Sequence, residues 1–177
     1  MTRGLRAALL GCLLSGFLIL MANGREWARV AYPDRPRGVT GSSLAGSLTV
    51  WGLVALAGVV AVAATRRLGR IPVGGALLAS GVTVAALSVR AIREVNVRVL
   101  EDTVLRRIPT TPTAVDLTVW PYVAVAAGAL LALTGLLVAV RGPRWAALSA
   151  KYDAPADRPV TDADLWAAQD RGEDPTA

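Results

Sequence analysis

The apolar residues of this chain are gathered into four blocks separated by charged segments. They cover residues 5–22, 48–64, 71–89 and 119–140. None of the blocks carries a charge in its middle, and a helix needs about 20 predominantly apolar residues to cross a bilayer. The pattern predicts an all-α fold: a four-helix transmembrane bundle over residues 1–144, followed by a polar, partly disordered tail over residues 145–177.

The first block also resembles a cleavable signal peptide. Arg3 and Arg6 precede its apolar core, and Ala22-Asn23-Gly24 offers small residues around a cleavage point. The uncharged run from Ala7 to Ala22 is slightly longer than a signal core of about 7–15 residues. We therefore favour a retained span.

The polar connections differ in character. The first, Asn23 to Ser47, is rich in Gly, Pro and Ser, and Pro33 and Pro36 favour irregular structure. The third repeats charges of alternating sign every four residues, which predicts that the third span continues as a charged helix until Pro109. Its alternating valines, from Val95 to Val99, allow an extended strand instead. We favour the helix.

Arginine placement predicts the orientation of the spans. The turn at residues 65–70 holds three arginines and no acidic residue, and the N-terminus and the start of the tail are also basic. The other two connections mix arginines with acidic residues. Because basic residues close to span ends favour the cytoplasm, we expect a multi-pass protein of the plasma membrane with both termini cytoplasmic.

Composition excludes several kinds of site. The chain is 54% hydrophobic and 18% charged, with a mean hydropathy of +0.48. It has no histidine and a single cysteine, Cys12, which excludes imidazole or thiolate metal clusters and a disulfide within one chain. The net charge of +6 fits arginines that flank spans and contact lipid head groups. No basic stripe with interleaved aromatics points to nucleic acid.

No group of residues has the pattern of a catalytic site. Serine-type chemistry would need lysine as its base, and the only lysine is Lys151, in the tail. The neighbouring carboxylates Glu101-Asp102 and Glu173-Asp174 lie in polar segments where solvation explains them. Gly74-Gly75 lacks the lysine of a phosphate-binding loop. We therefore expect no enzyme and no cofactor.

Small residues and tryptophans indicate how the spans pack and where they end. The fourth span carries small residues on one helix face, which allows close helix packing in lipid. They are Ala124, Gly128, Ala132 and Gly135. The third span offers Gly75 with Ala79, or Gly81 with Ala85. Trp51, Trp120 and Trp145 stand at span ends and are predicted interfacial anchors. Trp27 and Trp166 lie in polar segments and are candidates for contacts outside the bilayer.

The tail is acidic and carries a short predicted helix at about residues 162–171. Thr161 suits its N-cap and Gly172 its end. Two or three turns are marginal alone in water, so the helix is expected to dock through Leu165 and Trp166. The partner would be the basic turn at residues 66–70 or another protein. A disordered tail whose tryptophan touches head groups is the alternative.

Four segments outside the apolar cores are distinctive: residues 24–30 (GREWARV), 64–66 (ATR), 145–153 (WAALSAKYD) and 164–176 (DLWAAQDRGEDPT). Together they resemble the actinobacterial Trp biosynthesis-associated membrane protein family, also called tryptophan-associated transmembrane proteins. The resemblance implies four spans and a link to tryptophan biosynthesis genes. It identifies no catalytic or ligand-binding residue.

Two functions follow as hypotheses. The first is a non-enzymatic membrane protein linked to tryptophan biosynthesis, acting as a scaffold, a regulator or a partner through its tail. The second is a small transporter, or transporter subunit, for an aromatic metabolite. The absence of charges at mid-depth in the spans makes a self-sufficient transporter the weaker hypothesis.

Overall fold

The computed structural model describes residues 3–33, 36–65, 67–105 and 113–145. The chain divides into two compact units, residues 1–146 and 147–177. All the described residues belong to the first unit. The predicted tail helix at about residues 162–171, with Leu165 and Trp166, lies outside them.

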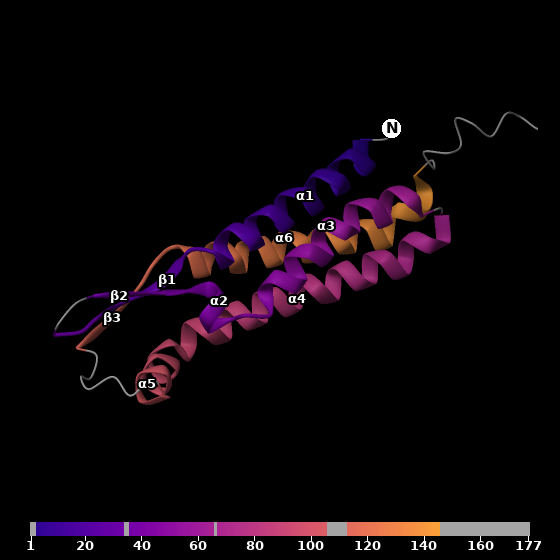
Figure 1. Ribbon diagram of the computed structural model, residues 1–177. Helices are drawn as coiled ribbons and strands as arrows, with labels where there is room; N and C mark the ends of the chain where they lie inside the picture. The colour runs from indigo at the N-terminus through magenta and orange to yellow at the C-terminus, as the bar shows by residue number, and fades with distance from the viewer. Residues whose placement is uncertain (1–2, 34–35, 66, 106–112, 146–177) are drawn as a thin grey trace, which may run out of the picture. The chain divides into compact units, whose positions relative to one another are not determined.

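Four apolar helices run side by side in the first unit (Figure 1). They are α1 (Arg3–Asn23), α3 (Leu48–Ala64), α4 (Arg70–Arg93) and α6 (Trp120–Arg141). Short 3₁₀ turns η1 (Arg67–Gly69) and η2 (Gly142–Arg144) precede α4 and follow α6. The helix positions match the four apolar blocks to within a few residues, since long apolar runs favour helix and the prolines Pro72 and Pro121 fall in the first turns of α4 and α6. Among the described helices, those at residues 3–23, 70–93 and 120–144 are long and apolar enough to cross a membrane, and α3 has 17 residues.

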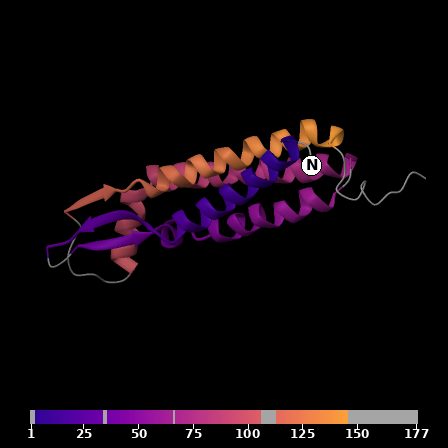
Figure 2. The same ribbon diagram turned by 90° about the horizontal axis from the view of Figure 1, so that it is seen from above.

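The described fold is mostly helical, as predicted, but it also contains a three-stranded antiparallel sheet that the all-α prediction missed. Its strands are β1 (Glu26–Ala31), β2 (Arg37–Thr40) and β3 (Ala114–Leu117), in the order β2-β1-β3. Figure 2 shows the sheet beyond one end of the helices. Residues 26–31 and 37–40 were expected to be irregular. They form strands because β1 gains a partner from a distant segment, with Arg29 opposite Asp116, and because Pro33 lies between β1 and β2, where it breaks no ladder.

The sheet is tied to the helices through Trp27. The side chain is 1% exposed, and its indole Nε1 donates a hydrogen bond to the Ala22 carbonyl oxygen at 2.8 Å. A bulge between Glu26 and Ala28 shifts the register of β1 and β2, so that Trp27 and Ala28 are both buried. The short helix α2 (Gly41–Leu44) follows β2. It packs closely here, because a side chain at Gly41 would stand 2.5 Å from the Trp27 Nε1.

The third connection is helical, as predicted, but it does not continue α4. The helix ends at Arg93, and a separate helix α5 (Val95–Leu105) leaves in a different direction (Figure 1). Val95 and Val99 are buried in the core, and Arg98 Nη1 donates a hydrogen bond to the Leu44 carbonyl at 2.7 Å. These tertiary contacts join α5 to the core and to α2, an arrangement that the charge pattern alone did not show.

Candidate functional site

Glycines bring the backbones of α4 and α6 together. A Cβ at Gly128 would stand 2.7 Å from the Ala85 backbone nitrogen, and one at Gly81 would stand 2.6 Å from the Gly128 carbonyl oxygen. Two turns further along α6, a Cβ at Gly135 would stand 2.7 Å from the Gly74 carbonyl oxygen. The glycines recur every seven residues on both helices, which keeps them on the shared face.

The predicted small-residue face of α6 therefore lies against α4 within the same chain. Ala124, Gly128 and Gly135 are buried, and Ala132 is half-buried. Of the two pairs offered on α4, the structure brings Gly81 and Ala85 to the contact. Gly75 has open space around it.

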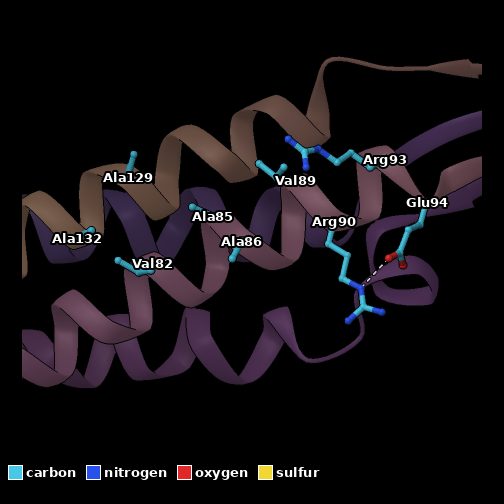
Figure 3. A pocket seen from close by; sticks show the side chains of 10 residues that line it. Val82, Ala85, Ala86, Val89, Arg90, Arg93, Glu94, Ala129 and Ala132 are labelled. Atoms are coloured by element: carbon cyan, nitrogen blue, oxygen red, sulfur yellow. Dashed lines mark hydrogen bonds and ion pairs between the residues drawn. The ribbon is translucent and has the colours of Figure 1, made fainter.

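A groove of about 610 Å³ runs along this seam (Figure 3). Its α4 wall is formed by Gly81, Val82, Ala85, Ala86 and Val89, and its α6 wall by Ala129 and Ala132. The apolar walls offer dispersion contacts and no proton donor side chain. Charged groups occur only where α4 ends, at Arg90, Arg93 and Glu94.

Glu94 joins the end of α4 to the start of α5. Its carboxylate accepts a hydrogen bond from Arg90 Nε at 2.8 Å and another from Arg98 Nη2 at 3.0 Å. The hydrogen bonds from Arg98 and then Arg90 lower the pKa of the Glu94 carboxyl below its ordinary value. Over Arg90, Glu94 and Arg98, the four-residue alternation of charge read from the sequence thus forms two ion pairs.

A second hollow, also about 610 Å³, lies beside the sheet and is far more polar. It is lined by Gly24, Arg25, Glu26, Arg29 and residues 116–120. The Arg25 guanidinium carbon is 5.3 Å from the centre of the Trp120 ring, a cation–π contact, and Arg29 pairs with Glu26 at 3.6 Å. Both signs of charge and an aromatic face therefore line one cavity. The sequence showed these residue types but not that they lie close together, because they belong to segments far apart along the chain, around β1, β3 and the start of α6.

The predicted tryptophan anchors occupy three different environments. Trp51 is half-buried and packs against the core, and Trp120 lines the polar hollow. Trp145 is 8% exposed and lies close to Gly4, where a Cβ would stand 2.8 Å from its Nε1. Trp27 makes its contact inside the chain. Anchoring of the three span-end rings in head groups stays a prediction.

The two ends of the helices carry different charges. At the end where α1 begins, the described side chains include arginines but no acidic residue; the arginines are Arg3, Arg6, Arg70, Arg141 and Arg144. At the sheet end, arginines stand beside Glu26, Glu94 and Asp116. In the described part of the chain, no three His, Cys, Asp or Glu residues group as metal ligands would.

Long apolar helices packed through glycines, with charges confined to their ends, define a helical membrane protein. A model of the tryptophan-associated transmembrane protein family matches residues 9–176, and the chain belongs to this family. The resemblance noted in the sequence is thereby confirmed. No curated protein and no solved structure matches the chain.

Proposed function

We propose that this protein is a four-span, non-enzymatic membrane protein that serves tryptophan biosynthesis as a scaffold, a regulator or a partner of other proteins. The observation that carries the proposal is the separation of charge along the helices. One end is purely basic among the described side chains, and the other is a folded cap of mixed charge. Such a chain presents a different surface on each side of a membrane.

Four spans are supported by the packing of the first two helices. With 17 residues, α3 extends about 26 Å at about 1.5 Å per residue, which is close to the thickness of a bilayer core of about 30 Å. α1 packs against both α3 and α6. A Cβ at Gly16 would stand 2.8 Å from Leu56, and one at Gly52 would stand 2.7 Å from Leu20. Cleavage of α1 as a signal peptide would remove this packing, and the packing therefore supports its retention.

The orientation we propose places both termini in the cytoplasm. The basic end contains the start of α1 and the end of α6, together with the turn between α3 and α4. Basic residues near span ends favour the cytoplasmic side. The sheet and α5 would then lie outside the cytoplasm.

A protein partner would bind the cytoplasmic tail. The amino acids of its predicted helix support this, because Leu165 and Trp166 form an apolar pair in an acidic segment. We propose no cofactor and no nucleic acid for the chain.

The polar hollow supports a second candidate, a transporter subunit for an aromatic metabolite. Its arginines suit a carboxylate, Asp116 and Glu26 suit an ammonium group, and the Trp120 ring suits an aromatic side chain. The groove between α4 and α6 has no aromatic ring in its lining, and its charged groups stand only at one end.

A strain without the gene separates the two functions. The first proposal expects slower growth without tryptophan, together with unchanged initial rates of tryptophan uptake and efflux. A large change in either rate, with normal biosynthetic capacity, would instead support the transporter. Normal growth and normal rates together would reject both.

A further inference from the structure

Arg70, the first residue of α4, is enclosed at the basic end of the helices. The side chain is fully buried, and its Nη1 donates hydrogen bonds to the carbonyl oxygens of Gly142 and Trp145, each at 3.0 Å. Its guanidinium carbon is 5.9 Å from the centre of the Trp145 ring. A Cβ at Gly142 would stand 3.0 Å from the Arg70 side chain, so the absence of a side chain there makes room for the arginine.

Half of the guanidinium has no partner among the described residues. Nε and Nη2 of Arg70 are buried, and no described residue accepts a hydrogen bond from either of them. Their N–H groups point from one edge of the planar group, the edge that binds two oxygens of a carboxylate or phosphate at once. Burying a cation with unpaired donors costs folding free energy. An anion bound at this edge would offset that cost.

The surroundings select the kind of anion. The other described side chains at this end are basic or uncharged, and the charged ones are Arg3, Arg6, Arg141 and Arg144. Several positive charges around a bidentate arginine suit the phosphate oxyanion, which Arg binds through two parallel hydrogen bonds. Arg70 also stands where the apolar part of α4 begins, the level at which head-group phosphates lie beside a spanning helix.

We propose that the Arg70 guanidinium, with Trp145 against it, is a binding site for a phosphate oxyanion supplied by the head group of an anionic phospholipid. The oxyanion accepts hydrogen bonds from Nε and Nη2, while Nη1 keeps the guanidinium in place on the two carbonyls. The site rests on the membrane placement in the proposed function but not on any role in tryptophan biosynthesis.

The test uses the full-length protein in a non-ionic detergent. Binding and thermal unfolding are measured with added phosphatidylglycerol, phosphatidylcholine or inorganic phosphate. The wild type should bind phosphatidylglycerol at least tenfold more tightly than phosphatidylcholine, and its unfolding temperature should rise accordingly. Arg70→Met should lose tenfold or more of that affinity, and Arg70→Lys should fall between the two. The control Arg37→Gln, which removes an exposed arginine at the sheet end of the helices, should stay within twofold.

Unfolding without lipid gives the baseline for each variant. Methionine also removes the two hydrogen bonds from Nη1, so the rise in unfolding temperature on adding phosphatidylglycerol is compared with the lipid-free form of the same protein. An equal rise for Arg70→Met and for the wild type would overturn the site. Equal binding of both lipids by the wild type would also overturn it, even if Arg70→Met fails to fold. If inorganic phosphate saturates the site while phosphatidylglycerol and phosphatidylcholine bind equally, the phospholipid is rejected as the source of the oxyanion. The ligand would then be soluble phosphate.

Discussion

At the residue scale, glycine determines how closely α4 and α6 can approach. In lipid the helices gain no hydrophobic driving force by associating, so their packing depends on close contact between backbones. Gly81 and Gly128 face one another, and neither has room for a Cβ. Any side chain at these positions must push the two helices apart.

Gly128→Leu should therefore destabilise the bundle. Overpacking of a close contact costs about 1–3 kcal/mol, and here the contacted atoms are backbone, which cannot yield as a flexible side chain would. Ala126 is exposed on the other side of α6, so Ala126→Leu should change stability little. Thermal unfolding of both variants in the same detergent provides the measurement. Equal losses would remove the role of glycine at the seam.

Glu94 supplies a titratable residue at the join between α4 and α5. Hydrogen bonds from Arg98 and Arg90 lower its pKa in the folded protein, so the unfolded chain binds this proton more readily. Its contribution to stability is complete above the ordinary carboxyl pKa of about 4.3 and is lost as the pH falls through the lowered value.

The wild type should consequently be more stable than Glu94→Gln at neutral pH, and the difference should shrink as the pH falls from about 5 towards the lowered pKa. Unfolding of both proteins across this range, at constant ionic strength, measures the difference. Because the group is exposed, the effect should also weaken with added salt. A difference that does not change with pH would contradict the ion-pair role.

At the scale of elements, the segments outside the apolar helices show what sequence periodicity can and cannot reveal. The charge spacing in the third connection indicated helix, and α5 is a helix. The same spacing gave no sign that α5 would leave α4, because the hydrogen bond between Arg98 and the Leu44 carbonyl joins segments far apart in the sequence. The tail helix stays a prediction outside the described residues, based on Thr161 as its N-cap and Gly172 as its end.

Truncation after Pro159 tests whether the helix predicted at about residues 162–171 is needed for function. The apolar helices need nothing beyond residue 159 for insertion, so the shortened protein should reach the membrane in normal amount. It should fail to restore growth in the deletion strain, since it lacks Leu165 and Trp166. Immunoblotting of membranes and a growth assay without tryptophan give the two readouts. Full complementation would show that the tail helix is dispensable.

At the scale of the whole molecule, the fold separates charges that the sequence mixes. Counted along the chain, arginines are almost as frequent in one set of connections as in the other. Once folded, the connections with acidic residues meet at the sheet, while the basic ones gather at the opposite end of the helices. The resulting asymmetry is the physical basis of the orientation we propose.

Reporter fusions at Pro36, Gly69, Thr111 and Ala177 measure that orientation. Fusions at Pro36 and Thr111 should show activity typical of the far side of the membrane, and fusions at Gly69 and Ala177 activity typical of the cytoplasm. A far-side signal at Gly69 or at Ala177 would contradict four spans with cytoplasmic termini.

The sequence by itself determined the positions of the apolar helices and the small-residue face of α6. Both are local: a long run of apolar residues, or a repeat on one helix face, is visible without knowledge of the fold. The tertiary structure alone decided the sheet, because β1 and β3 pair Arg29 with Asp116, which are far apart in sequence. It also decided that Gly81 and not Gly75 meets α6, and that Arg70 is buried beside Trp145. Each of these features depends on which surfaces of distant segments come into contact. A local pattern of residues along the chain does not contain that information.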